Sequence, residues 1–290
     1  MPEINKHNLS RYIPQEVQRE VRQNSFFGCV ICGGGICAID HVDPEFNDAK
    51  SHSADCMTLL CGSCHDKKTR GIIGIETVKK AMAEPYCSKN KMPSDFLDFG
   101  NGVPRVQFGK ILFINPSSVI SIDGVSILSI KPPNHENLHG RHLLNAFFHD
   151  ISGEEIFKIE DNIWHGSIKN WDIQSIGKTI TIRSKKGSIL LEIENIPEDK
   201  LIIHKLIMVF KKYQVEIDKN GVEIITPTGK ELFSLNGKKG KVGEIEGEIA
   251  LNIKNERILV TDLNISDVDL KVKGGDVSYN VIRDSDITLG

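Results

Sequence analysis

The chain has 290 residues, of which 39% are hydrophobic and 26% are charged, and its net charge is −3. Its length exceeds one typical domain of about 100–200 residues, and its composition is that of a globular protein, which argues against disordered and fibrous classes. The N-terminus lacks the apolar stretch of a secretion signal, and the most apolar run, residues 201–210, contains a histidine and a lysine. We therefore expect a cytoplasmic protein that does not contact a membrane.

The first expected element is a short amphipathic helix within residues 10–24. Ile13, Val17 and Val21 recur at four-residue spacing, which places them on one helical face. Because the chain as a whole is not basic, any contact with nucleic acid needs a local patch of positive charge. The polar face of this helix offers two such side chains, Arg19 and Arg22.

The next elements follow a glycine-rich turn. Residues 36–42 alternate in polarity as a β-strand does. A second helix is expected from about Met57 and a third over residues 75–84, while residues 93–104 have the glycine, asparagine and proline content of a linker.

Beyond residue 105 the pattern changes. Short runs of isoleucine, valine and leucine recur about every 8–12 residues between turn-forming residues, which indicates a mostly β region. We expect a β-rich domain over residues 105–215 and a further β-rich segment over residues 216–290, arranged as a sandwich or a β-solenoid. Residues 142–150 and 197–210 also fit a helix. Exposed strand edges favour self-association, so we expect a homo-oligomer.

All seven cysteines lie in the first 87 residues, and four of them form two C-x-x-C pairs. In a chain without an export signal, such pairs favour a metal site over a disulfide scaffold. Four thiolates are a ligand set for one tetrahedral structural zinc ion per chain. Cys37 and Cys56 remain open as substitutes for one of the four, and a core or redox role is the alternative. The expected ligands are Cys29, Cys32, Cys61 and Cys64.

Three motifs occur in a fixed order: F-G-C-x-x-C-G at residues 27–33, I-D-H-V-D-P at 39–44 and M-T-L-L-C-x-x-C-H-D at 57–66. This order resembles the four-cysteine branch of the HNH endonucleases over residues 10–70, about a quarter of the chain. The resemblance implies an α+β protein whose N-terminal domain, residues 1–92, has the ββα-metal fold, in which a β-hairpin and a helix surround one catalytic divalent ion.

The resemblance also implies roles for single residues. His41 matches the general base, and Asp40 and His65 match the ligands of a catalytic Mg²⁺ or Mn²⁺ ion. Hydrolysis of a phosphodiester needs an activated water and a cation beside the phosphate, so these residue types suit that chemistry. The family has asparagine, which orients the base, where this chain has Cys56. This departure keeps open a second hypothesis, a catalytically silent zinc module that binds nucleic acid or a protein.

Basic side chains near these motifs are expected to contact DNA phosphates, which positions a duplex without reading its sequence. His52 lies in a loop and is expected to be exposed. A nuclease joined to a β-rich region suggests an effector of a bacterial restriction or anti-phage defence system, whose second module senses, targets or oligomerises, and which has a partner protein in that system. The expected phosphate contacts are Arg19, Arg22, Lys67, Lys68 and Arg70.

Overall fold

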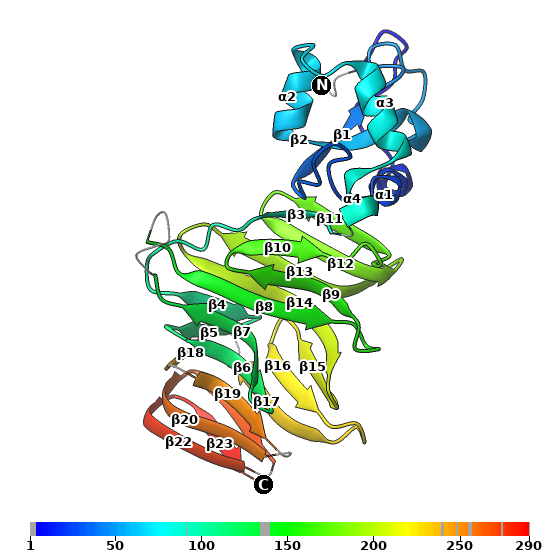
Figure 1. Ribbon diagram of the computed structural model, residues 1–290. Coiled ribbons are helices and arrows are strands. Elements are labelled where there is room, and N and C mark those ends of the chain that lie inside the picture. Colours follow the sequence, from blue (N-terminus) through cyan, green and yellow to red (C-terminus); the bar gives the residue numbers. More distant parts are fainter. Residues whose placement is uncertain are drawn as a thin grey trace. The chain divides into compact units, whose positions relative to one another are not determined.

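The computed structural model describes residues 4–90, 92–133, 140–238, 241–247, 249–254, 257–273 and 275–289. The chain has an α+β fold in which strands predominate (Figure 1). It divides into two compact units. Among the described residues, none of the helices combines the length and apolar character that a membrane crossing requires. The first unit comprises Met1–Asp95, His165–Ile176 and Ile182–Lys186, and the second comprises Phe96–Trp164, Gly177–Thr181 and Gly187–Gly290.

The first unit contains most of the helices. Its strand β2 was expected to belong to a helix, but a continuous apolar run such as M-T-L-L-C fits a buried strand equally well, and four of its five residues are buried. The elements in chain order are α1 (Gln15–Asn24), β1 (Cys37–His41), the short 3₁₀ helix η1 (Ala54–Cys56), β2 (Met57–Cys61), α2 (Gly62–Thr69), α3 (Ile75–Ala83), α4 (Tyr86–Asn90) and β11 (Asp172–Ile176).

Strands β1 and β2 form an antiparallel two-stranded sheet with an apolar cluster on each face. The register places Cys37 opposite Cys61 and His41 opposite Met57. Successive side chains of a strand point to opposite faces. Leu60 accordingly packs in a cluster with Val78 of α3, whereas Met57 packs in a separate cluster with α1. Helix α2 starts directly after β2, whereas residues 42–56, which include η1, connect β1 to β2 (Figure 1).

A buried ion pair joins α1 to β11 within the first unit. Arg22 donates from Nε and Nη2 to the two carboxylate oxygens of Asp172 at 2.8 and 2.9 Å. The side chains are 11% and 2% exposed, so both charges depend on each other for compensation. Arg183 lies 3.4 Å from the same carboxylate. Residues from the middle of the chain thus complete the unit that holds the cysteines.

The second unit is built from short strands that form a curled sheet. Strands β13 to β17 pair antiparallel in sequence, as do β6 to β9. Parallel pairs join strands that are distant in sequence, β4 with β14 and β5 with β18. The strands that lie mainly in this unit are β4 (Arg105–Phe108), β5 (Ile111–Ile114), β6 (Ser118–Ile122), β7 (Val125–Lys131), β8 (Leu143–His149), β9 (Glu155–Glu160), β13 (Ser188–Ile196), β14 (Lys200–Phe210), β15 (Tyr213–Ile217), β16 (Gly221–Ile225), β17 (Glu231–Gly237), β18 (Gly243–Glu246), β19 (Ile249–Lys254), β20 (Arg257–Ser266), β21 (Val268–Val272), β22 (Gly275–Arg283) and β23 (Asp286–Leu289).

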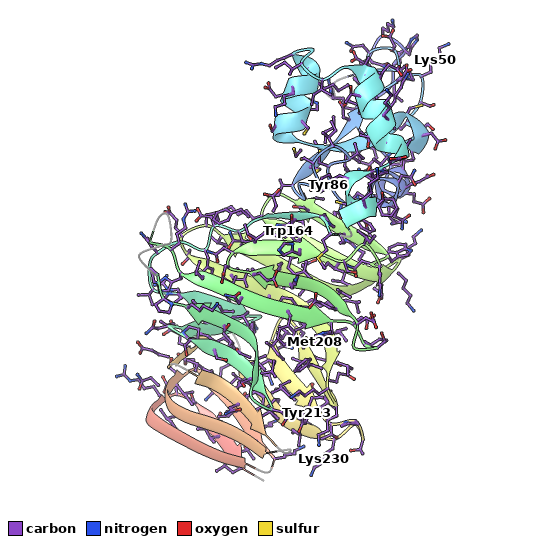
Figure 2. All side chains as sticks on the ribbon, viewed as in Figure 1. Lys50, Tyr86, Trp164, Met208, Tyr213 and Lys230 are labelled. Atoms are coloured by element: carbon purple, nitrogen blue, oxygen red, sulfur yellow. The ribbon has the colours of Figure 1, made fainter. Side chains whose placement is uncertain are left out.

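Large side chains fill the core of the second unit. Trp164, Met208 and Tyr213 are almost completely buried (Figure 2). Trp164 stacks on Phe157 with 5.5 Å between ring centroids. Stacked aromatic pairs of this kind contribute beyond the area that they bury. Trp164 therefore has a packing role, the commoner use of a buried tryptophan.

Several expectations for the β-rich region differ from the structure. We expected a sandwich or a β-solenoid, and the structure instead has a curled sheet. Residues 142–150 and 197–210, which also fitted a helix, contain β8 and β14. The expected linker holds the short strand β3 (Ser94–Phe96) and two buried side chains, Leu97 and Phe99. The expected boundary after residue 215 falls inside β15, because strand pairing does not follow changes in local composition.

Candidate metal centre and active site

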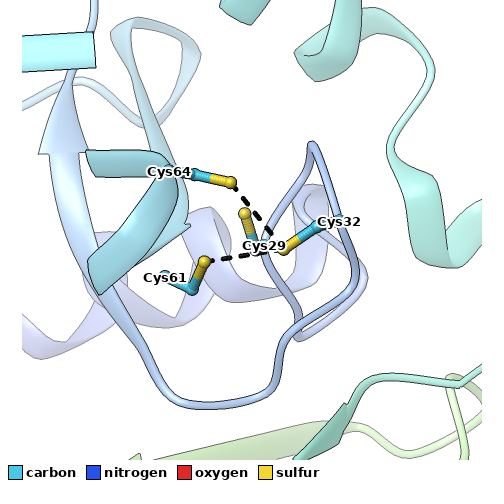
Figure 3. A group of neighbouring side chains, drawn as sticks. All are labelled: Cys29, Cys32, Cys61 and Cys64. Carbon is cyan, nitrogen blue, oxygen red and sulfur yellow. Dashed lines mark hydrogen bonds between the residues drawn. The ribbon is translucent and has the colours of Figure 1, made fainter. Parts of the chain in front are cut away.

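Four cysteines of the first unit converge on one point (Figure 3). Their sulfur atoms all lie within 4.8 Å of one another, and the Sγ atom of Cys32 is 3.5 Å from that of Cys61 and 3.8 Å from that of Cys64. Four sulfurs at about 2.3 Å from a tetrahedral zinc ion are about 3.8 Å apart. The sulfur positions are therefore compatible with a structural zinc ion. The four residues are Cys29, Cys32, Cys61 and Cys64.

Local backbone geometry produces this convergence. The first pair lies in a turn in which the N–H of Gly33 donates to the Cys29 carbonyl at 2.8 Å. Gly33 has φ +77°, a conformation that favours glycine. A Cβ atom at this position would also lie 2.5 Å from the ring of Tyr86 and would clash with it. In the second pair, Cys61 is the N-cap residue of α2 and Cys64 lies in its first turn. Each pair thus brings two sulfurs to the same point.

The environment shifts the pKa values of these thiols in opposite directions. Burial raises the pKa of Cys32 to about 11, and nearby cysteines add to the effect. Burial acts on Cys61 as well, but the N–H of Cys64 and the neighbouring thiols hold the pKa of Cys61 below its usual value. Several thiolates this close repel one another unless a cation lies between them. Within the described residues, Cys37 and Cys56 do not belong to the group, so neither replaces a ligand.

The carboxylate of Asp40 and the imidazole of His65 meet beside this cluster. Asp40 lies on β1, and its Oδ1 atom is 3.4 Å from Nε2 of His65 on α2. His65 directly follows Cys64, so the cysteine cluster holds its backbone in place. Asp40 is 12% exposed and His65 is 46% exposed, which leaves the pair open to solvent on the imidazole side. One oxygen and one nitrogen donor are thereby brought together from two elements.

Lys68 completes the surroundings of Asp40. Its Nζ atom lies 2.8 Å from Oδ2 of Asp40 and donates to the carbonyl oxygen of His41 at 3.1 Å. The lysine side chain is only 9% exposed. Residues 65 and 68 are three apart on a helix and so share one face. The expectation that Lys68 contacts a DNA phosphate does not fit this geometry, because its ammonium group is occupied within the site.

His41 follows Asp40 on β1 and is 9% exposed. Its Nε2 atom lies 3.1 Å from Nδ1 of His52, and its ring packs edge-on against Phe46 with 5.4 Å between centroids. Burial lowers the pKa of His41 below its usual value, and His52, Arg11 and Lys68 act in the same direction, against Asp40. His41 is therefore neutral near pH 7 and able to accept a proton.

The other basic residues differ in availability. Arg22 was expected to contact phosphate, but its guanidinium group is buried and bonds the Asp172 carboxylate through Nε and Nη2, so it is engaged within the unit. Arg19 lies over the ring of Trp171 at 4.6 Å, a cation–π contact. Lys67 of α2 and Arg70, the C-cap residue of α2, are exposed, and Arg70 has a loose pair with Asp66.

Sequence patterns missed one residue of this site. His52, expected at the surface, is partly buried and bridges His41 and the Ser10 carbonyl. It lies in a loop without periodicity, and its two partners are 11 and 42 residues away in sequence, so no local pattern identifies it.

Comparisons of this chain with models of known protein families, with curated proteins and with solved structures found no match. The resemblance to HNH endonucleases therefore rests on the order of its motifs, and the functional assignment depends on the geometry described above.

Proposed function

We propose that the first unit is a metal-dependent HNH endonuclease that hydrolyses phosphodiester bonds in DNA. One observation carries this proposal: Asp40 of β1 and His65 of α2 lie 3.4 Å apart, in a unit whose four cysteines converge on one point, and the neutral His41 directly follows Asp40 in the chain. A carboxylate, an imidazole and a separate neutral histidine are the groups that metal-assisted hydrolysis requires.

The Asp40–His65 pair fits a divalent ion such as Mg²⁺ or Mn²⁺. Asp40 and His65 would hold such an ion through one carboxylate oxygen and one imidazole nitrogen, and Mg²⁺ usually keeps several water ligands. When bound, the ion supplies positive charge that offsets the charge developing on the leaving oxygen. Lys68 compensates Asp40 from the opposite carboxylate oxygen. His41 accepts the proton of the attacking water, for which its lowered pKa keeps it ready at neutral pH.

Two further features support the proposal, namely exposed basic side chains and a second unit. Lys67 on the helix that carries His65 and Arg70 at the C-cap of that helix are exposed, so they are available to phosphate groups that flank the cleaved bond. The second unit, with its many strands, serves in this proposal as a module that senses, targets or oligomerises. Because the proposed nuclease is joined to such a module, we propose that the protein is an effector of bacterial restriction or anti-phage defence.

The direct test is cleavage of supercoiled plasmid in Mg²⁺ or Mn²⁺ by the zinc-loaded wild type and by His41→Ala. Loss of a general base lowers rates by about 10²–10⁴-fold. His7→Ala is the matched control, because His7 is an exposed histidine of the same unit. Equal rates for wild type and His41→Ala with every metal and DNA form would overturn the proposal.

A second function is favoured by Cys56, which stands where the family has asparagine. In that case the first unit is a silent zinc-binding module that recognises nucleic acid or a protein. Cys56→Asn separates the two functions. A large gain in cleavage supports an enzyme impaired at this position, whereas tight DNA binding without cleavage in both forms supports the silent module.

A further inference from the structure

A chain of hydrogen bonds leads from the protein backbone to His41. The Nε2 atom of His52 lies 2.8 Å from the carbonyl oxygen of Ser10. A carbonyl oxygen can only accept, so Nε2 of His52 carries the hydrogen atom. In neutral His52 the other ring nitrogen, Nδ1, then has a free lone pair. The backbone of Ser10 thus determines which tautomer His52 adopts.

The same reasoning extends to the next ring. Nδ1 of His52 lies 3.1 Å from Nε2 of His41 and, having a lone pair, accepts from it. Nε2 of His41 therefore carries its hydrogen atom, and Nδ1 of His41 is left with the lone pair. One backbone carbonyl, acting through one imidazole, selects the basic nitrogen of His41.

The carbonyl at the start of this chain is itself held in place. Asn5 is 7% exposed, and its side-chain amide donates to the carbonyl oxygens of Phe46 and Ala49 at 2.5 and 2.7 Å. Its Oδ1 atom accepts from the backbone N–H of Leu9 at 2.9 Å. These bonds tie the segment that ends at Ser10 to the loop that carries Phe46. Phe46 in turn packs on His41 and lies under the guanidinium group of Arg11 at 4.5 Å.

We propose that His52 is a positioning residue that fixes the tautomer and the ring orientation of His41, so that Nδ1 of His41 receives the proton of the attacking water. This inference rests on the proposed nuclease function. It assigns to His52 a role that does not require contact with DNA or with the metal ion.

The proposed step balances as follows. The water oxygen bonds to phosphorus while its proton passes to Nδ1 of His41. The bond between phosphorus and the leaving sugar oxygen breaks, its electron pair goes to that oxygen, and solvent water protonates it. His41 becomes an imidazolium ion whose Nε2–H still donates to His52. An acceptor at that point stabilises the charge that forms on His41.

The first test is the ¹⁵N chemical shift of both ring nitrogens of His41 in zinc-loaded full-length protein without Mg²⁺ or Mn²⁺. We expect the Nε2–H form in wild type and a mixture of tautomers in His52→Ala. This measurement does not need cleavage, so it decides the inference even where the nuclease proposal fails. A wild-type His41 with hydrogen on Nδ1, or an unchanged tautomer in His52→Ala, would overturn it.

The second test uses plasmid cleavage. His52→Ala should lower kcat by about 10–100-fold with little change in KM, the usual cost of losing a partner that orients a reactive group. His52→Asn should recover most of the rate, because its carbonyl oxygen can accept from Nε2 of His41. Zinc content and melting temperature report on a merely structural role and should stay near wild type in both. Equal rates for wild type and His52→Ala, or no difference between the two variants, would contradict the proposal.

Discussion

Lys68 holds the carboxylate of Asp40 from the side opposite His65, with Nζ 2.8 Å from Oδ2, while Oδ1 is 3.4 Å from the imidazole. The carboxylate therefore has one oxygen that is compensated within the protein and one that faces the more exposed histidine. A divalent ion at the pair would share Asp40 with an ammonium group, which limits the affinity of the site for metal because the two positive charges repel each other.

Replacing Lys68 should show separately how much this lysine stabilises the fold and how much it weakens metal binding at Asp40. In Lys68→Met the Asp40 carboxylate loses its partner, so we expect a loss of about 3 kcal/mol in the free energy of unfolding without divalent ion, and a larger rise of melting temperature on addition of Mn²⁺. Lys67→Met, at the exposed neighbouring position, is the control. If Mn²⁺ raises both melting temperatures equally, Lys68 does not compete with metal at Asp40.

Removing a cysteine of the cluster should release zinc. Cys64 is 5% exposed and belongs to the group, so Cys64→Ser should bring zinc per chain from one to near zero and lower the melting temperature. Cys56→Ser, outside the group, should keep its zinc. Elemental mass spectrometry gives the number of zinc ions per chain. A wild type that is metal-free and well folded would contradict the site.

The pair between Arg22 and Asp172 is a structural element, and its loss should cost stability. Arg22→Met leaves the buried Asp172 without the guanidinium group of Arg22, while Arg183 remains 3.4 Å from its carboxylate, and we expect a decrease of about 3 kcal/mol in the free energy of unfolding. The double variant Arg22→Met/Asp172→Leu should recover part of that loss, since it removes both charges. Chemical denaturation measures the free energy of unfolding of the single and the double variant, with Arg19→Met as the control on the same helix. A stable Arg22→Met protein with weaker DNA binding would instead assign Arg22 to phosphate contacts.

A cluster of acidic residues in the second unit predicts a pH effect on stability. Glu223 lies opposite Glu216 in the β15–β16 pair. Burial raises the pKa of Glu223, and Glu231, Glu216 and Asp218 add to this against Lys273. Because the folded protein binds the proton more tightly, the charged form costs stability above this pKa, and the cost disappears as pH falls below the unfolded value near 4.5.

The matching variant is Glu223→Gln. Like charges directly opposite on neighbouring strands destabilise, so we expect this variant to be more stable than wild type by up to about 1 kcal/mol at pH 7. The difference should shrink towards pH 4. Glu155→Gln, at an exposed position of β9, is the control. A constant difference across this pH range would show that repulsion at Glu223 is not the cause.

The sequence predicted those parts of the structure that depend on short-range patterns. The two C-x-x-C spacings identified all four cysteines of the cluster, because three-residue spacing already constrains where two sulfurs point. Residues 36–42 alternated in polarity and contain β1. The mostly β character of the second unit followed from the density of β-branched residues between turns.

What the sequence did not reveal depends on contacts between distant segments. The partner of Arg22 is 150 residues away, and nothing near either residue marks the pairing. Residues 57–61 form a strand rather than a helix because the β1 strand pairs with them, and an apolar pentapeptide has no periodicity of its own. His52 could not be assigned from a loop sequence, since its role depends on the Ser10 carbonyl.

The order in which the chain is synthesised has a bearing on when the first unit is complete. A ribosome that has made residue 95 has added every cysteine, His41 and His65 to the chain, but Asp172 is still to be translated. At about 5–20 residues per second, that takes several more seconds. Until then Arg22 lacks the carboxylate of Asp172. The first unit is therefore completed only after residues 96–171 have been made. A truncated product from a broken message would carry the proposed catalytic groups without the support that they need.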